Sequence, residues 1–371
     1  MLKFEIIKED SETNARMGIL TIKNKKINTP NLWLGCLTKN RLFPWEYFDV
    51  NTIMVNAYEI IKGNIAIESI HKFLKTDGLV MMDSGGFQLY KKRVKVSPDE
   101  ILEIYKQTEP DIGVILDHPL NPSHLDMRFE KWKKTLDNTI YMLNNANGTI
   151  LMPVIHGYTI KEVKKACKEL KEIIDPQIIG IGSLVPIIRS IKSSSLTKLN
   201  HINSIDFMVK IISVVRKEFP DSFLHTFGIG GTTTMHFLFG LGVDSVDSMS
   251  WRMKAAYGAI QLPGIGDRFI APKSDRGRTK LKENSLLKSC NCPICSGKSL
   301  KERKGFLDNS KKDTFSNRAV HNAYTFKEEE KLFHKAFEES NLLKFLRNRL
   351  RKTRYYKSLE TYLNNRNETI V

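Results

Sequence analysis

Short runs of apolar and β-branched residues recur along the first 250 positions, and most of them end in a polar residue. Eight such runs predict buried strands: 31–35, 52–58, 79–84, 112–117, 150–156, 178–183, 223–229 and 245–250. Between them lie stretches with apolar residues three and four positions apart, which predict amphipathic helices, as at 98–108, 160–174 and 207–219. Strands and helices that alternate in this way predict an α/β fold, a (β/α)8 TIM barrel.

The alternation stops after residue 271. A segment rich in Lys, Ser and Asn follows, with three cysteines, and helical patterns resume at residue 326. We therefore predict two domains: residues 1–271 as a catalytic barrel, and residues 272–371 as a metal-binding subdomain with basic C-terminal helices. In 341–362 a stripe of leucines opposes Lys and Arg side chains, which predicts a helix that packs on the barrel. Its basic face could contact phosphates or simply be solvated.

The charge is strongly positive, with 58 Lys and Arg against 41 Asp and Glu and a net charge of +17. Residues 272–371 carry 24 basic and 12 acidic side chains, so most of the excess lies there. Basic proteins gain binding energy from polyanions by releasing counterions, which favours nucleic acid as the partner. An AT-rich genome that inflates Lys is the alternative. The N-terminus has no apolar signal core, and we expect an intracellular protein.

Three closely spaced cysteines predict a metal site. Cys290, Cys292 and Cys295 are followed after 25 residues by His321, which completes a tetrahedral set of ligands for Zn²⁺. Four protein ligands leave no open position, so the zinc would be structural. His334 is an alternative fourth ligand, and free thiols or a redox pair are the alternative to a metal.

Polar residues stand at the ends of the predicted strands, where TIM barrels carry their catalytic groups. Asp83 begins the run Asp-Ser-Gly-Gly-Phe-Gln at 83–88, which suits a pocket for a flat base but could also be a plain strand-to-helix connection. Asp247 ends the last strand across the mouth. Two opposed carboxylates are what retaining glycosyl chemistry requires, one as nucleophile and one as acid and base. Asp244 reads better as a helix N-cap.

These motifs resemble the tRNA-guanine transglycosylase superfamily over about residues 29–321. The resemblance rests on 83–88, on 242–247 and on the spacing of the cysteines and His321. It implies a (β/α)8 barrel with a zinc subdomain, which exchanges guanine in a polynucleotide for a 7-deazaguanine. It further implies that Asp247 forms a covalent bond to C1′ of the target guanosine, and that Asp83 protonates the leaving base and deprotonates the incoming one.

The resemblance also implies a pocket for the base. Asp117 matches the residue that reads the amidine edge of the purine, with Ser84 and Gln88 as its hydrogen-bonding neighbours. Phe87 and Phe227 would enclose the ring from opposite faces.

Two further features concern the choice of base. The resemblance implies that the turn Gly182-Ser183-Leu184 offers backbone N–H groups to the base carbonyl. His156 stands where the bacterial enzymes have a glutamine, so selectivity among 7-deazaguanines is in doubt.

The chain is similar to the archaeal branch but lacks the long C-terminal RNA-binding extension of that branch, which suggests the DNA-modifying members of the superfamily (DpdA type). Our first hypothesis is therefore exchange of guanine in DNA for 7-cyano-7-deazaguanine (preQ0) in the cytoplasm of a bacterial or phage-infected cell. The same exchange on tRNA is the alternative; a non-catalytic partner subunit and a generic glycosidase rank lower. A helicase-like or ATPase partner and a homodimer are further hypotheses that the sequence does not decide.

Overall fold

All eight predicted runs form strands of one parallel sheet in a computed structural model, which describes residues 1–39, 41–63, 65–86, 94–189, 193–272 and 277–365. The strands are β4 (Asn31–Gly35), β5 (Thr52–Asn56), β6 (Leu79–Asp83), β7 (Ile112–Val114), β8 (Leu151–Met152), β9 (Val154–Ile155), β10 (Ile178–Ile181), β11 (Phe223–Thr226) and β12 (Ser245–Ser248). The run 150–156 divides into β8 and β9 at Pro153, which has no N–H for a strand ladder. Because β8 pairs with β7 and β9 with β10, the sheet nearly closes, which confirms the predicted barrel.

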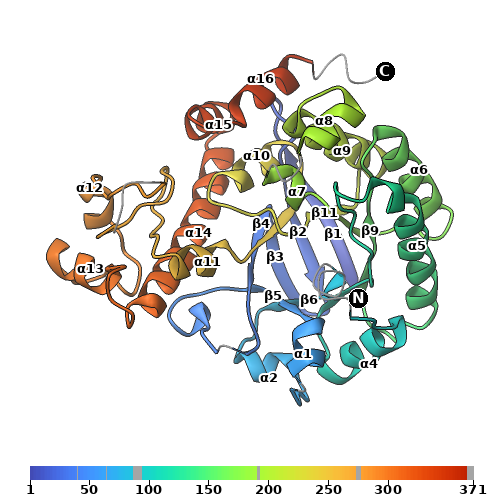
Figure 1. Cartoon of the computed structure of the whole chain (residues 1–371), viewed down its shortest axis with the longest axis horizontal. Helices are drawn as coiled ribbons and strands as arrows, with labels where there is room; N and C mark the ends of the chain where they lie inside the picture. The colour runs from blue at the N-terminus through green and yellow to red at the C-terminus, as the bar shows by residue number, and fades with distance from the viewer. Residues whose placement is uncertain (40, 64, 87–93, 190–192, 273–276, 366–371) are drawn as a thin grey trace.

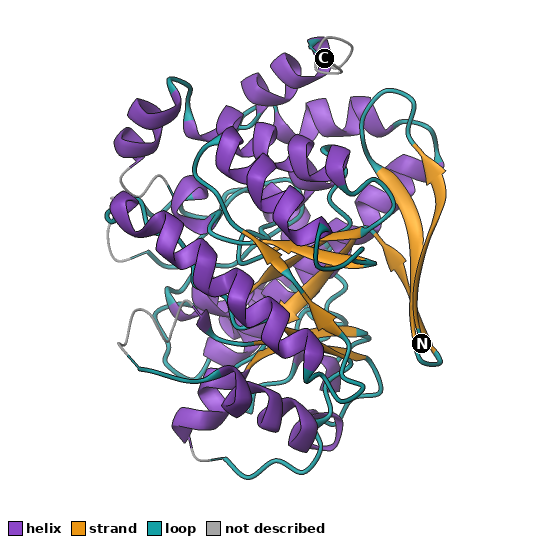
Figure 2. Ribbon diagram, turned by 90° about the vertical axis from the view of Figure 1, so that its right-hand side faces the viewer, coloured by secondary structure: helices purple, strands orange, loops and turns teal. Residues whose placement is uncertain are grey.

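Helices surround the barrel (Figures 1 and 2). The predicted helices at 98–108, 160–174 and 207–219 are confirmed as α4 (Pro98–Thr108), α6 (Ile160–Lys171) and α9 (Ser204–Glu218). Each begins after a side chain that accepts a backbone N–H: Ser97, Thr159 and Asn203. The other helices that follow barrel strands are α1 (Ala57–Gly63), α2 (Ile70–Leu74), α5 (Arg128–Asn144), α7 (Val185–Ile188), α8 (Ser193–Asn200), α10 (Thr234–Gly240) and α11 (Ser250–Ala256). Among the described residues, no helix has both the length and the apolar character needed to cross a membrane.

An antiparallel sheet that the sequence analysis did not predict precedes the barrel. It consists of β1 (Leu2–Glu9), β2 (Arg16–Ile22) and β3 (Lys25–Thr29). Its apolar side chains, Leu20, Ile22 and Ile27, share one buried cluster with residues that begin barrel strands, among them Leu79 and Phe223. The sheet therefore covers the N-terminal end of the barrel.

The C-terminal part of the chain belongs to two hydrophobic cores. A small core around Cys292 and Cys295 includes Leu287, Leu307 and Ile260, and it lies beside α12 (Asn284–Lys288) and α13 (Leu300–Leu307). The later helices are α14 (Phe315–Glu338), α15 (Leu342–Leu350) and α16 (Tyr356–Asn364), and their apolar faces join the main core of the barrel. In Figure 1 α14 runs between the barrel and the outlying α12 and α13. The division at residue 271 stays a prediction.

The leucine stripe in 341–362 packs inward as predicted. Leu342, Leu346 and Leu350 of α15 are buried. On the basic face, Arg347 pairs with Glu360 at 2.9 Å; Arg349, which points inward, pairs with the buried Glu329. Part of this positive charge is therefore already neutralised within the chain.

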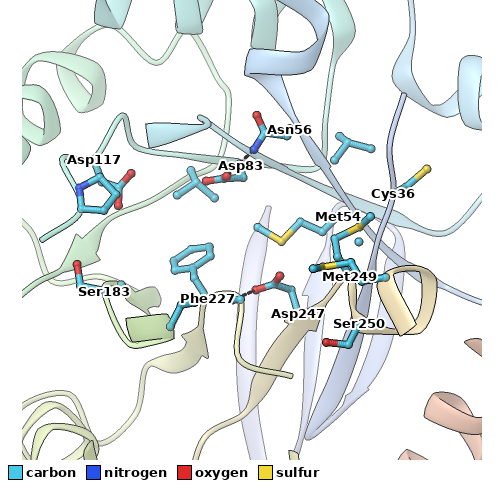
Figure 3. A pocket seen from close by; sticks show the side chains of 18 of the residues that line it. Cys36, Met54, Asn56, Asp83, Asp117, Ser183, Phe227, Asp247, Met249 and Ser250 are labelled. Atoms are coloured by element: carbon cyan, nitrogen blue, oxygen red, sulfur yellow. Dashed lines mark hydrogen bonds between the residues drawn. The ribbon is translucent and has the colours of Figure 1, made fainter. Parts of the chain in front are cut away.

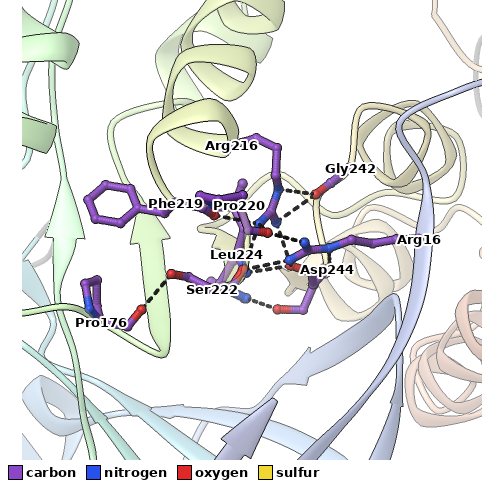
Figure 4. A network of polar contacts seen from close by, with 11 residues as sticks. Arg16, Pro176, Arg216, Phe219, Pro220, Ser222, Leu224, Gly242 and Asp244 are labelled. Carbon is purple, nitrogen blue, oxygen red and sulfur yellow. Dashed lines mark hydrogen bonds and ion pairs between the residues drawn. The ribbon is translucent and has the colours of Figure 1, made fainter. Parts of the chain in front are cut away.

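A buried ionic network joins the N-terminal sheet to the barrel at Asp244 (Figure 4). Arg16 donates to both oxygens of the Asp244 carboxylate at 2.8 Å, and Arg216 of α9 donates to Oδ2 at 2.6 Å. The N–H of Leu224 in β11 also donates to Oδ2, at 2.7 Å. Burial lowers the pKa of Arg216 to about 10. The N-cap interpretation of Asp244 was wrong: the residue precedes strand β12, and its carboxylate binds two arginines rather than a helix N-terminus.

Replacing Asp244 should destabilise the fold strongly. Asp244→Ala leaves two arginines buried without their counter-charge, and breaking such a pair costs about 3–5 kcal/mol of unfolding free energy. Urea denaturation followed by circular dichroism would measure the loss. Glu130→Ala, which breaks the exposed pair between Glu130 and Lys134, is the control and should leave the midpoint nearly unchanged. Equal midpoints for the two variants would contradict the anchoring role.

Candidate active site and metal centre

The C-terminal ends of the barrel strands surround a cavity of about 390 Å³ (Figure 3). Asp83 ends β6, Asp117 follows β7, and Asp247 lies in β12 near the same rim. Six residues predicted for the site line this cavity: Asp83, Asp117, Gly182, Ser183, Phe227 and Asp247. The barrel therefore brings together three carboxylates and one aromatic ring from the ends of four strands, β6, β7, β11 and β12.

Three other predicted residues are buried near the cavity without lining it. Ser84 donates its hydroxyl to the carbonyl of Ile115 at 3.3 Å. The His156 ring lies beside Asp117, and Leu184 is packed in the main core. Phe87 and Gln88 lie outside the described residues. The roles of all these residues in base binding stay predictions.

The two glycines after Asp83 are required by close packing. Gly85 has φ +88°, and a Cβ there would lie 2.5 Å from Cβ of Tyr58. A Cβ on Gly86 would overlap the carboxylate of Asp117 and lie 2.5 Å from its carbonyl oxygen. The glycines thus let Asp83 and Asp117 approach the same cavity.

Asp83 is set up to hold a proton. Its surroundings raise its pKa to about 8, chiefly through burial and then through repulsion from Asp117 and Asp247. Backbone N–H groups of Gly85 and Ser84 oppose this shift only in part. At neutral pH Asp83 is therefore mostly protonated and can act as a general acid.

Asn56, which is not among the predicted site residues, orients this acid. Its Nδ2 donates to Oδ2 of Asp83 at 2.8 Å, while its Oδ1 accepts the N–H of Tyr58 at 2.9 Å. Asn56 is the last residue of β5, which pairs in parallel with β6 at Asp83. In the sequence, the only sign of this role is that Asn56 is a polar residue near the end of the apolar run 52–58.

Asp117 faces a serine–histidine pair, in which His156 is buried and Ser183 is half-buried. The hydroxyl of Ser183 accepts the N–H of Leu120 at 2.8 Å and lies 2.8 Å from Nδ1 of His156. The hydroxyl can therefore donate its proton to Nδ1, which leaves N–H at Nε2, 3.0 Å from Oδ2 of Asp117. Within the described residues this last contact lacks in-line hydrogen-bond geometry, so we treat it as electrostatic.

Asp247 is nearly buried and presents its carboxylate to the cavity opposite Asp83 (Figure 3). The N–H of Gly228 donates to its Oδ1 at 2.5 Å. A protonated carboxyl and a second carboxyl that share one cavity can perform acid-assisted displacement at a glycosidic carbon.

The four predicted metal ligands come together in the small C-terminal core. The ligand atoms of Cys290, Cys292, Cys295 and His321 all lie within 4.8 Å of one another. Nε2 of His321 lies 2.9 Å from the carbonyl of Gln261, which fixes a proton there and turns the lone pair of Nδ1 toward the three sulfurs. His334 instead bonds the carbonyl of Pro30 at 2.6 Å and lies outside this cluster. Three thiolates and one imidazole fit a closed, structural zinc site.

The chain matches the family described as queuine tRNA-ribosyltransferase over residues 10–355. It is similar to the tRNA-guanine(15) transglycosylase of Pyrococcus furiosus, with 29% identity over 366 residues, 95% of this chain and 57% of that protein. The enzyme of the same name from Methanocaldococcus jannaschii is 28% identical over 371 residues, 94% of this chain and 52% of the relative. The enzyme of the same name from Saccharolobus solfataricus is 26% identical over 359 residues, which are 93% of this chain and 66% of that protein. The chain thus spans roughly half to two thirds of these relatives.

The cysteine cluster predicts the metal content of the protein. The purified chain should carry about one zinc ion, and Cys292→Ser should lose most of it because a serine hydroxyl is a poor zinc ligand. Elemental analysis by mass spectrometry would measure this. Cys167→Ala is the control, since Cys167 is buried in α6, outside the cluster. Undiminished zinc in Cys292→Ser would rule out the proposed ligand set.

The raised pKa of Asp83 predicts a pH-dependent stability. Between its ordinary value of about 4 and about 8, the folded protein binds a proton that the unfolded chain has released, so the free energy of unfolding falls as pH rises. Asp83→Asn removes this penalty. Its stability advantage over the wild type should grow from about pH 5 to about pH 8, with a slope approaching about 1.4 kcal/mol per pH unit.

Urea denaturation at several pH values would measure this difference. Asp313→Asn, at an exposed aspartate, is the matched control. A stability difference for Asp83→Asn that does not change with pH would show that Asp83 is ionised in the folded protein.

Proposed function

Because the chain belongs to the queuine tRNA-ribosyltransferase family, we propose that it exchanges a guanine base in a nucleic acid for a 7-deazaguanine base. One observation carries this proposal: Asp83 and Asp247 line one cavity, and the pKa of Asp83 is raised to about 8. One carboxyl can then donate a proton while the other attacks, which is the division of roles that glycosyl exchange needs.

The exchange proceeds through two displacements at C1′ of the target nucleoside. In the first, a carboxylate oxygen of Asp247 bonds to C1′ as the bond from C1′ to N9 breaks. The electron pair of that bond passes to the leaving guanine, which takes the proton of Asp83. In the second, N9 of the incoming base loses its proton to Asp83 and bonds to C1′, which releases the carboxylate of Asp247.

The cavity has the groups to hold a flat purine between the two acids. Asp117 offers a carboxylate to the donor edge of guanine, and Phe227 offers a ring face for stacking. Ser183 also lines the cavity, and its backbone N–H is the proposed donor to the base carbonyl, because the N–H of Gly182 already donates to the carbonyl of Ile155 at 3.0 Å. A nucleotide must leave its stack to reach this depth, so the target base is flipped out.

The names of the relatives favour tRNA as the substrate over the DNA that the sequence analysis put first. The net charge of +17 suits either polyanion. We therefore place tRNA first as the substrate, and we keep preQ0, which the resemblance suggested, as the proposed incoming base. A helicase-like partner and a homodimer stay predictions.

Zinc held by Cys290, Cys292, Cys295 and His321 would stabilise the C-terminal core and takes no part in the exchange.

Uptake of a labelled base tests the proposal directly. The purified protein is incubated with labelled preQ0 and, separately, with tRNA, single-stranded DNA or duplex DNA. We expect label in the tRNA pool alone, and none with Asp247→Asn, because an amide cannot form the ester. Asp83→Asn should slow uptake by about 10²–10⁴-fold, the usual contribution of a general acid.

The control is again Asp313→Asn, which should label tRNA at the wild-type rate. Label only in DNA would restore the first hypothesis. Failure to label any pool, or full activity of Asp247→Asn, would overturn the proposed mechanism.

A further inference from the structure

A buried histidine lies directly beside Asp247 and has no role in the exchange as described above. His225 belongs to β11, and its backbone partner in β12 is Ser245. Its ring is fully buried, with Nδ1 2.7 Å from Oγ of Ser245 and Nε2 3.4 Å from Oδ1 of Asp247. Because Ser245 and Asp247 are two residues apart on one strand, their side chains share a face, and one imidazole reaches both.

The carboxylate determines which ring nitrogen carries the proton. If Nδ1 carried the only proton, the lone pair of Nε2 would face a carboxylate oxygen, which is repulsive. If the hydroxyl of Ser245 donates to Nδ1, Nε2 carries the proton and donates to Asp247. We therefore assign the Nε2–H form; a doubly protonated ring would present the same donor.

The two carboxylate oxygens of Asp247 consequently differ in their hydrogen-bond partners. Oδ1 accepts the N–H of Gly228 at 2.5 Å and faces Nε2 of His225. Over the described residues, Oδ2 has no protein hydrogen-bond partner. Gly228 has φ +70°, so this N–H comes from a backbone turn that suits glycine.

We propose that His225 is a positioning residue, which with the N–H of Gly228 holds Oδ1 of Asp247 so that Oδ2 is the oxygen that attacks C1′. The inference rests on the proposed function. In the first displacement Oδ2 bonds to C1′ as the C1′–N9 electron pair leaves with the base, which Asp83 protonates. Oδ1 becomes the carbonyl oxygen of the ester and keeps both donors. The separation of 3.4 Å shortens in the loaded site, as catalytic hydrogen bonds often do.

A purely structural role for His225 is the competing explanation. The ring also packs edge-on against Phe227, with centroids 4.5 Å apart, and Phe227 lines the cavity. Loss of the ring could therefore disturb the pocket without any effect on the aspartate. The two explanations predict different results for a substituted side chain that keeps only the N–H donor. The reaction rate recovers if His225 positions Asp247, and it stays low if the ring is needed for packing.

The test compares His225→Leu, which removes the donor, with His225→Gln, whose side-chain amide offers an N–H close to the position of Nε2. The measured quantity is the single-turnover rate at which the protein forms a denaturation-resistant adduct with end-labelled tRNA, together with the Kd for tRNA. His225→Leu should slow adduct formation by about 10- to 100-fold, the cost of a misaligned reacting group, with little change in Kd. His225→Gln should recover most of the rate.

The matched control is Thr226→Val on the same strand. Its hydroxyl is buried and has no hydrogen-bond partner among the described residues, and Thr226 does not line the cavity. This variant should form the adduct at the wild-type rate. Equal losses in His225→Leu and His225→Gln, or no loss in either, would overturn the positioning role.

A second measurement does not depend on activity. Long-range ¹⁵N NMR of the histidine rings, with His225 identified by its absence from His225→Gln, reports the tautomer directly. An N–H at Nε2 is expected, and a ring protonated only at Nδ1 would overturn the proposal. If the wild type forms no adduct with tRNA or DNA, the proposed function fails, whereas the NMR result still decides whether His225 donates to Asp247.

Discussion

The buried carboxylate of Asp244 is the contact on which the position of the site depends. It gathers Arg16 from the N-terminal sheet, Arg216 from α9 and the N–H of Leu224 from β11 at one point. Asp244 directly precedes β12, and Asp247 lies three residues further along the chain. Because a strand is a stiff element of fixed rise per residue, anchoring its start also fixes the depth at which Asp247 meets the cavity.

The mouth of the barrel gathers three carboxyl groups, and Asp83 is stabilised in a different way from Asp117 and Asp247. Burial and repulsion keep Asp83 protonated, and the amide of Asn56 orients it. Asp117 and Asp247 are each faced by a buried histidine whose other nitrogen lies 2.7–2.8 Å from a serine hydroxyl. The same serine–histidine arrangement thus occurs on two sides of one cavity. Protonation of Asp83 leaves two negative charges in this space, and each of these carboxylates lies close to a histidine nitrogen, which limits their mutual repulsion.

The sequence predicts local features of this structure better than contacts across strands. All eight strand runs were confirmed, and the four predicted metal ligands lie together, because apolar runs and cysteine spacing can be recognised from residues close in the sequence. The choice of His321 over His334 needed the fold, since each imidazole is held by a different backbone carbonyl. The first sheet was missed although its first strand alternates apolar with charged residues, a pattern typical of a strand with one exposed face, because the predicted strands were all buried apolar runs. Asn56 and His225 were missed because their partners lie on adjacent strands, about 20 to 30 residues away.

The metal centre and the catalytic cavity are connected through one residue of α14. Asn322, next to the predicted ligand His321, donates to the carbonyls of Trp251 and Ala259 and accepts the N–H of Gln261. Trp251 belongs to α11, which follows β12, and Ser250 before it lines the cavity. A zinc ion that holds α14 in place would therefore also hold the turn after Asp247. In this fold the four predicted metal ligands and the cavity at the barrel mouth are linked through Asn322, although none of the four ligands lines the cavity.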